Sequence, residues 1–538
     1  MERQMKVCVV GAGASGLPSI HWAKLYGFQV TCFEASPDIG GLWRYKDHST
    51  QESSVMRGTV INTSKEMTAY SDYPPPADFP NFMHNAKLMQ YFRSYADEMD
   101  LLPHIKLNHK VLNIQRTDDY GKTGQWSVQY QDGDGQTNEE IFDGVLLCTG
   151  HHANNNMPKW DGMESFPGKI IHSHDYKSPD GYGEKTVIVV GMGNSGVDVA
   201  CELGRVSKQT YLVSRRGAWV FSRMKGNDKC FDMELNNRFI TLSLLKVLPF
   251  WMLERMVEWD VEKRFDHEKF GLKPKHHIFS AHPTLSDELP NRVMSGTVKV
   301  KPGISKFVGS TVYFEDGTKA ENVDEVVCCT GYSFTFPLLE KGNLLPVTGN
   351  RHGGIYKFMF PLQIADKNSL ALIGLVQPWG SIMPISEMQA RVFFANLRGD
   401  IKLPEKEMMK KEAVEAVEAL GKRYVDSPRH TLQVDFVPYI EDLAKMIDCH
   451  PDEWNYVFSD PILFKAVQFG PNVAYVYRLR GPFAWKGARK AVMEVMDRVD
   501  QGISGGRPRK IFRDEGAKFY VDNGCERSRI RYLPEDNT

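Results

Sequence analysis

The sequence predicts a mixed α/β fold, mainly because one short pattern occurs twice. Residues 6–16 read KVCVVGAGASG and residues 186–196 read TVIVVGMGNSG, so an apolar, mostly β-branched run leads into G-x-G-x-x-G in both places. Such a run is typical of a buried strand, and the glycines are typical of a tight turn that joins it to a helix. Glycine fills 45 of 538 positions, so chance gives about 0.3 such patterns per chain. Two matches behind strand-like runs therefore predict two nucleotide-binding units.

The order of strand-like runs predicts that one unit is inserted into the other. GVLLCTG at 144–150 and EVVCCTG at 325–331 both end in Thr-Gly and bracket the second glycine pattern. We expect two Rossmann-type dinucleotide-binding domains, the second inserted into the first. The first domain would span residues 1–158 and resume at 332–400, with a strand at 370–376. The second would span 159–331 with an elaboration at about 222–295, and a mostly helical C-terminal region with a polar tail would span 401–538.

Composition excludes several classes of function. Lys plus Arg (66) nearly equals Asp plus Glu (67), so no net charge recruits nucleic acid or an anionic membrane. The nine cysteines include no C-x-x-C pair, which favours a reducing compartment. No apolar run is long enough to span a membrane; the nearest, FITLSLLKVLPFWML at 239–253, is interrupted by Lys246 and Pro249. It could contact a membrane surface peripherally or form a core or substrate-tunnel helix.

The first nucleotide site carries an acid where a ribose would lie. Glu34 follows Gly11 by 23 positions, and a carboxylate there can accept hydrogen bonds from a free 2′-hydroxyl, as in FAD or NAD. The GGLW segment that follows permits a close backbone approach and offers the flat face of a tryptophan. The expected contacts of this site are Gly11, Gly13, Ala14, Ser15, Gly16, Glu34, Gly41, Leu42 and Trp43.

The second site has no acid at the matching position. Ser214 lies 23 positions after Gly191 and is followed by Arg215 and Arg216. A hydroxyl and guanidinium groups accept a 2′-phosphate that a carboxylate would repel, so this site favours NADPH. The alternative for Arg215 and Arg216 is a basic edge that is exposed to solvent and binds no ligand. The expected contacts of this site are Gly191, Gly193, Asn194, Ser195, Gly196, Asp198, Ser214, Arg215 and Arg216.

Two unlike nucleotide sites indicate redox chemistry, in which a nicotinamide passes a hydride to a flavin. A disulfide reductase would need a redox-active cysteine pair, and the cysteine spacing does not provide one. Molecular oxygen is the more natural electron acceptor. The other class of function considered is a nucleotide-binding sensor without turnover, but the intact glycines and Glu34 favour an enzyme.

Between the two glycine patterns, residues 166–176 (FPGKIIHSHDY) match F-x-G-x-x-x-H-x-x-x-[YFW]. This is the fingerprint of class B flavoprotein monooxygenases, and Tyr176 in place of tryptophan resembles the flavin-containing monooxygenase branch. GGLWRY at 40–45, NTSKEM at 62–67 and PTLSDELPNR at 283–292 also resemble that family. Many animal members end in a hydrophobic anchor, whereas this chain ends RSRIRYLPEDNT. We therefore expect no signal peptide and no C-terminal anchor, and a cytoplasmic enzyme, with peripheral attachment to the endoplasmic reticulum membrane as the alternative.

The resemblance implies FAD and NADPH as cofactors and oxygen plus small nucleophilic molecules as substrates. A C4a-hydroperoxyflavin would convert soft nitrogen or sulfur compounds, xenobiotics among them, to N-oxides or S-oxides, as in N,N-dimethylaniline monooxygenases. Baeyer–Villiger oxygenation of ketones, or an NADPH oxidase that releases hydrogen peroxide, are the alternatives.

The resemblance also assigns individual residues. It implies a catalytic Asn62 near the reacting carbon of the flavin, with Thr63 and Gln377 among the flavin contacts. The alternative for Asn62 is an ordinary turn asparagine. His172 and His174 lack the further ligands that zinc needs, so we expect a structural link between domains and no metal site.

Overall fold

Two parallel β-sheets organise the protein in the computed structural model, which describes residues 3–504 apart from 49, 51, 227, 228, 353 and 428. The first sheet has the order β26-β7-β1-β2-β3, and every neighbouring pair in it is parallel. Its strands are β1 (Lys6–Val10), β2 (Gln29–Phe33), β3 (Ile105–Lys106), β7 (Gly144–Leu147) and β26 (Leu370–Leu372). The strands β1, β7 and β26 are almost wholly buried, which explains their continuous apolar sequence.

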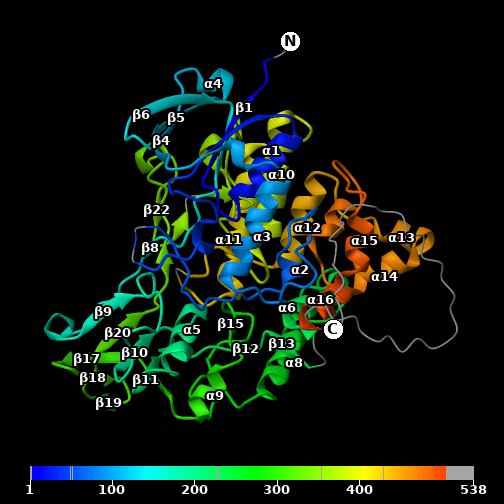
Figure 1. The fold of residues 1–538 in the computed structure, drawn as a ribbon. Helices are drawn as coiled ribbons and strands as arrows, with labels where there is room; N and C mark the ends of the chain where they lie inside the picture. The colour runs from blue at the N-terminus through cyan, green and yellow to red at the C-terminus, as the bar shows by residue number, and fades with distance from the viewer. Residues whose placement is uncertain are drawn as a thin grey trace, which may run out of the picture.

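The second sheet repeats this plan with the order β16-β11-β10-β20-β9. Its strands are also all parallel and lie at the lower left of Figure 1. They are β9 (Lys169–His172), β10 (Thr186–Val190), β11 (Gln209–Val213), β16 (Val298–Lys301) and β20 (Glu325–Cys328). The predicted mixed α/β fold with two parallel sheets is confirmed.

A short antiparallel ribbon joins the two sheets. β8 (Asn154–Asn155) pairs with β21 (Tyr332–Ser333), so the chain leaves the first sheet and returns to it at neighbouring points. A small antiparallel sheet accompanies each half. These sheets are formed by β4 (Lys110–Arg116), β5 (Trp126–Gln131) and β6 (Thr137–Phe142), and by β17 (Ile304–Val308), β18 (Thr311–Phe314) and β19 (Lys319–Ala320).

Helices follow both glycine-rich turns. α1 (Gly16–Leu25) follows β1 and α5 (Asn194–Leu203) follows β10, so each glycine pattern lies between a buried strand and a helix, as the sequence predicts. The remaining helices of the first half are α2 (Lys65–Thr68), α3 (Asn85–Glu98) and α4 (Tyr120–Thr123). The strand expected at 370–376 is shorter than predicted, because Gly374 adopts a φ of +79° just after β26.

The segment 222–295 contributes a helical layer that also packs against the C-terminal region. β12 (Val220–Phe221) leads into this segment. Its strands are β13 (Met224–Lys225), β14 (Lys229–Cys230) and β15 (Thr284–Leu285), and its helices are α6 (Phe231–Leu235), α7 (Leu245–Val247), α8 (Phe250–Glu262) and α9 (Leu289–Met294). The apolar run 239–253 is broken: a π-helical turn at Phe239–Leu244 leads into α7, and α8 starts after Pro249. Buried Arg238 pairs with Glu441 and Glu453 of the C-terminal helices.

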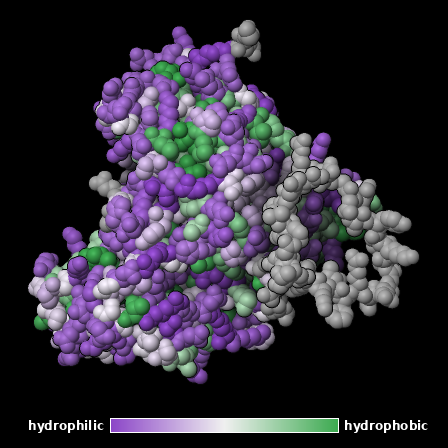
Figure 2. Space-filling view, in the orientation of Figure 1, coloured by the Kyte–Doolittle hydropathy of each residue, from purple (hydrophilic) through white to green (hydrophobic). Residues whose placement is uncertain are grey.

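The C-terminal region is mostly helical, as predicted. α10 (Ile382–Arg398) precedes this region, whose helices are α11 (Lys406–Arg423), α12 (Phe436–Met446), α13 (Glu453–Ser459), α14 (Pro461–Phe469), α15 (Ala488–Met493) and α16 (Val495–Ser504). α10 packs against α1, and the visible face is mainly hydrophilic with small apolar patches (Figure 2). Within the described residues, no helix combines the length and apolar character needed to cross a bilayer. The predicted polar tail beyond residue 504 lies outside the described residues.

Candidate functional site

The first glycine-rich turn can be built only with glycine at its ends. Gly11 has a φ of +101°, and a Cβ there would lie 2.7 Å from the carbonyl oxygen of Cys148. A Cβ on Gly16 would lie 1.8 Å from the carbonyl oxygen of Gly11. These contacts bring helix α1 directly onto β1, so the N–H groups at the start of α1 face the space beyond the strand. Such N–H groups are suited to bind a phosphate.

The GGLW segment lies against this turn and completes a cradle. A Cβ on Gly41 would lie 3.2 Å from the Cα of Gly13, and the Gly40 N–H donates to the Ala12 carbonyl over 2.9 Å. Leu42 belongs to the 3₁₀ turn Gly41–Trp43, whose tryptophan packs against the first core. Because glycines line both walls, a pyrophosphate can approach the backbone closely, so the site fits a dinucleotide.

The remaining predicted residues of the first site surround the turn. Tyr70 donates its hydroxyl to the Ala14 carbonyl over 2.7 Å, and the Ser15 hydroxyl lies 2.9 Å from that of Ser386. A Cβ on Gly374 would lie 2.3 Å from Ser15 Oγ, so the chain that leads to Gln377 passes this turn. Gln377 begins β27 (Gln377–Pro378), which pairs with β28 (Gln433–Val434).

Glu34 follows β2 and turns back over the first glycine-rich turn. Its Oε2 accepts a hydrogen bond from the Ala12 N–H at 2.7 Å. Its Oε1 accepts from the N–H and the hydroxyl of Ser36, at 2.9 and 2.7 Å. The carboxylate thus lies at the rim of the cradle, on the side where a ribose bound to this turn would extend.

The second turn has the same geometry. Gly191 has a φ of +122°, and a Cβ there would lie 2.3 Å from the Cys329 carbonyl oxygen; a Cβ on Gly196 would lie 2.0 Å from the Gly191 carbonyl oxygen. Asn194 accepts from the Leu285 N–H at 2.8 Å and donates to the Pro283 carbonyl at 3.3 Å. Its amide therefore orders the loop, while Ser195 is exposed at the start of α5.

The basic residues after β11 are free to meet an anion. The Ser214 hydroxyl accepts from the Gly217 N–H at 3.0 Å, and Arg215 and Arg216 are exposed. Among the described residues, no carboxylate forms an ion pair with either arginine. The edge of the second site is therefore open and cationic, in contrast to the edge with Glu34.

Asn62 lies where the second half of the protein contacts the first. Arg223 donates from Nη2 to Asn62 Oδ1 over 2.7 Å, and its Nη1 lies 3.2 Å from Asp287 Oδ2. Thr63 Oγ1 lies 2.8 Å from Thr68 Oγ1. The next residue, Ser64, donates its N–H to Asp232 Oδ2 over 2.7 Å. The segment 222–295 therefore holds the stretch 62–64 at two points, through Arg223 on Asn62 and Asp232 on Ser64.

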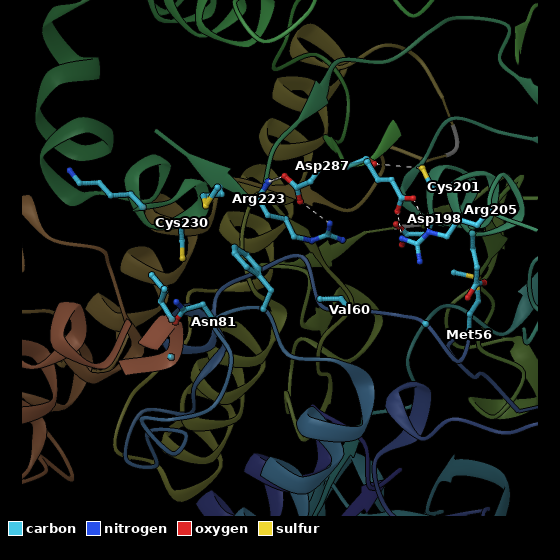
Figure 3. A pocket seen from close by; sticks show the side chains of 18 residues that line it. Met56, Val60, Asn81, Asp198, Cys201, Arg205, Arg223, Cys230 and Asp287 are labelled. Atoms are coloured by element: carbon cyan, nitrogen blue, oxygen red, sulfur yellow. Dashed lines mark hydrogen bonds and ion pairs between the residues drawn. The ribbon is translucent and has the colours of Figure 1, made fainter. Parts of the chain in front are cut away.

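A cavity of about 680 Å³ is lined by Arg223, the hydrogen-bond partner of Asn62. Figure 3 shows Arg223 beside Asp287 in one part of the wall. Asp198 of α5 and Arg205, which follows that helix, lie in another part, and Val60 lies between the two groups. Burial raises the pKa of Asp198 to about 6, and the nearby Arg223 opposes the rise. Apolar side chains such as Met56 and Phe82 also line the space. The cavity thus combines apolar walls with a few charged groups, which is typical of a small-molecule site.

Arg223 and Asp232 were not among the predicted site residues. They lie 161 and 168 positions from their partners Asn62 and Ser64, so no local pattern relates them. His172, in contrast, has a linking position consistent with the expectation: its Nε2 lies 3.1 Å from the Gly331 carbonyl oxygen, and His174 Nε2 lies 3.1 Å from that of Glu52. The part of the chain that the structure describes contains no group of three or more His, Cys, Asp or Glu side chains suited to a metal ion.

The fingerprint residues 166–176 pack at the edge of the second sheet. A Cβ on Gly168 would lie 2.3 Å from the Asp324 carbonyl oxygen, and the ring of Phe166 covers this glycine. Tyr176 is buried and donates its hydroxyl to Glu202 of α5 over 2.8 Å. The fingerprint therefore fixes β9 and α5 beside the second glycine-rich turn.

Two parallel sheets, each with a glycine-rich turn shaped for a dinucleotide, define an oxidoreductase that uses two such cofactors. The chain belongs to the flavin-binding monooxygenase-like family, whose model matches residues 4–513. It is 42% identical to flavin-containing monooxygenase 5 of Cavia porcellus, over 97% of this chain and 96% of that protein. It is 40% identical to flavin-containing monooxygenase 2 of Homo sapiens, over 92% of both chains. Among solved structures, S-allyl-L-cysteine S-oxygenase from Allium sativum matches with a TM-score of 0.62 and 22% identity, over 93% of this chain and 99% of that one.

Family membership confirms three predictions: a flavoprotein monooxygenase, FAD and NADPH as its cofactors, and small molecules and oxygen as its substrates. Both glycine cradles fit these groups, because a side chain in either would occupy the space next to the backbone. When bound, the two cofactors supply the hydride and activate the oxygen. The chain positions the cofactors and keeps water away from them.

Proposed function

We propose that the protein binds FAD on the first glycine-rich turn and NADPH on the second, and oxygenates soft nitrogen or sulfur compounds. The observation that carries this proposal is the contrast between the two rims. Glu34 reaches the first turn, whereas Ser214, Arg215 and Arg216 border the second without a carboxylate partner among the described residues. A carboxylate suits the free ribose of FAD, and a cationic rim suits the 2′-phosphate of NADPH.

The residue assignments follow from this placement. The flavin contacts proposed are the first turn, the GGLW segment, Glu34, Thr63 and Gln377; the NADPH contacts are the second turn, Asp198 and the residues after β11. The proposed domain boundaries are residues 1–158 with 332–400, 159–331, and 401–538. They are supported by the strands of the second sheet, which all come from residues 169–328.

Asn62 is the proposed catalytic residue. Its Oδ1 is occupied by Arg223, so its amide N–H groups remain to donate toward oxygen or nicotinamide at the reacting centre. Arg223 keeps the amide from rotating, so its N–H groups keep one direction. This arrangement favours oxygen transfer to substrate over loss of the oxidant to water.

Product analysis tests the proposed function. The FAD-loaded enzyme is supplied with NADPH, oxygen and either an alkyl aryl thioether or a cyclic ketone of similar size. Formation of sulfoxide in step with NADPH oxidation supports the proposal. Lactone from the ketone with no sulfoxide would identify a Baeyer–Villiger enzyme, and hydrogen peroxide without either product would identify an NADPH oxidase. Both of these results would contradict oxygenation of soft nucleophiles.

We further propose that exposed apolar side chains near the run 239–253 contact a membrane surface. Trp251 and Trp259 on α8 are 63% and 67% exposed, and Phe458 on α13 is 90% exposed. The π-helical turn that precedes α7 and α8 packs against α14, because the rings of Phe239 and Phe469 are 5.0 Å apart. Exposed tryptophans beside apolar residues are suited to the interface of a bilayer.

Vesicle sedimentation tests this surface. With phosphatidylcholine vesicles, we expect the double variant Trp251→Ser/Trp259→Ser to bind more weakly than the wild type. Ile141→Ser, which changes an exposed apolar residue on β6, serves as the control and should bind as the wild type does. Equal binding by all three proteins would contradict the proposal.

A further inference from the structure

Arg429 lies against the second glycine-rich turn, although it belongs to the C-terminal region. It precedes β28, far along the chain from β10. A Cβ built on Gly193 would lie 2.7 Å from Arg429 Nη2. Gly193 is the second glycine of the pattern, the position at which a bound dinucleotide brings its pyrophosphate closest to the backbone. The guanidinium group of Arg429 is therefore next to the place where that pyrophosphate would lie.

This guanidinium group lacks an anionic partner. Among the described residues, none forms a side-chain hydrogen bond or ion pair with it. Desolvation lowers the pKa of Arg429, and the charge of Arg216 lowers it further. His430 and His282 lie nearby, and burial lowers the pKa of both, which favours their neutral forms. Arg429 and Arg216 are both exposed, and an anion bound between these neighbouring cations would relieve their mutual repulsion.

The N-terminus of α5 also favours an anion next to Gly193. α5 has ten residues, begins immediately after Gly193, and has no side-chain cap at its N-terminus. Its first N–H groups and its dipole favour an anion at this end. Arg429 and the start of α5 thus both adjoin Gly193, and both favour negative charge there.

We propose that Arg429 binds the pyrophosphate of NADPH, so that the C-terminal region completes the second dinucleotide site. This inference rests on the proposed function. It divides the recognition of NADPH into two parts: the residues after β11 bind the 2′-phosphate, which distinguishes NADPH from NADH, and Arg429 binds the pyrophosphate, which both cofactors share.

The loop that carries Arg429 is also tied to the first half of the protein. The Gln377 N–H donates to the Leu432 carbonyl over 2.7 Å, and the Trp379 N–H donates to the Val434 carbonyl over 3.0 Å. Gln377 is a proposed flavin contact, so one short loop reaches from the NADPH phosphates to the strand beside the flavin. Arg429 is therefore placed to fix the distance between the two cofactors.

The test compares ligands that contain different parts of NADPH. FAD-loaded full-length Arg429→Gln, Arg429→Lys and Arg216→Gln are titrated calorimetrically with NADP⁺ and with 2′-AMP, which carries the 2′-phosphate but no pyrophosphate. For Arg429→Gln we expect NADP⁺ binding weakened about tenfold or more, with 2′-AMP binding unchanged. For Arg216→Gln we expect both ligands to bind more weakly. Arg429→Lys keeps the charge without the planar fork and should fall between Arg429→Gln and the wild type.

Steady-state kinetics give a second readout. Arg429→Gln should raise the KM of NADPH and of NADH by the same factor, whereas Arg216→Gln should raise only that of NADPH. Arg255→Gln on α8, an exposed arginine, controls for the loss of one positive charge. NADP⁺ affinity unchanged in Arg429→Gln, or 2′-AMP affinity lowered with it, would overturn the inference. If Arg429→Gln does not retain FAD, NADP⁺ affinity unchanged in Arg429→Lys would overturn it instead. A wild type that binds NADP⁺ but forms no oxygenated product would contradict the proposed function alone.

Discussion

Replacing Arg223 by glutamine removes the side chain that holds Asn62. The hydrogen bond from Arg223 Nη2 to Asn62 Oδ1 is 2.7 Å long, and the arginine side chain is only 15% exposed. A hydrogen bond with a charged donor contributes about 2 kcal/mol, which corresponds to roughly a 30-fold change in an equilibrium. Without this bond, the Asn62 amide turns more freely, and its N–H groups donate to the reacting centre for a smaller part of the time. We therefore expect a larger share of the NADPH to yield hydrogen peroxide.

The assay measures NADPH consumed, sulfoxide formed and hydrogen peroxide released in the same reaction. Arg223→Lys, which keeps the charge beside Asp287, should lose less product than Arg223→Gln. Arg223 also opposes the rise in the pKa of Asp198, so its loss should move that pKa further above about 6. The KM of NADPH should then depend on pH at higher values than in the wild type. If folded, FAD-loaded Arg223→Gln forms as much product per NADPH as the wild type, the reasoning about Asn62 is wrong.

Three further variants test other parts of the structure. Arg238→Met leaves the buried Glu441 without its main partner, so we expect a loss of about 3–5 kcal/mol in the free energy of unfolding; a melting temperature equal to that of the wild type would contradict this. Asp198→Asn should remove the pH dependence of the KM of NADPH near pH 6. Burial raises the pKa of Asp198 to about 6, so above that pH the ionised carboxylate lowers the stability of the folded protein. As the pH falls through about 6 the carboxylate is protonated, and the wild type should gain stability relative to the variant. Persistence of the same KM profile in Asp198→Asn would refute that role. Gly191→Ala places a Cβ 2.3 Å from the Cys329 carbonyl oxygen and should abolish NADP⁺ binding while bound FAD, measured by its absorbance, is retained; a parallel loss of both cofactors would show that the turns are not independent.

The local parts of the fold and site could be predicted from the sequence. Gly11 and Gly191 lie in short strand–turn–helix patterns, and the physical need for glycine arises within a few residues of each turn. Ser214 and Glu34 follow from the spacing of the same unit. Asn62 required the resemblance to a family, because a turn asparagine carries no chemical signal of its own.

The remaining contacts could not be predicted because they form between distant segments. Arg223 and Asp232 meet the segment 62–64 only after the layer 222–295 packs against the first half. Arg429 reaches Gly193 through the pairing of β27 with β28. These positions depend on tertiary packing, and no periodicity or spacing in the sequence records them.

The most direct test of the central claim is the fate of oxygen. The FAD-loaded wild-type enzyme is given NADPH, a thioether and isotopically labelled oxygen gas, and the sulfoxide is analysed by mass spectrometry. The account predicts one labelled oxygen atom in each sulfoxide molecule and about one sulfoxide per NADPH consumed. Sulfoxide without label, or NADPH oxidation that yields only hydrogen peroxide, would contradict it.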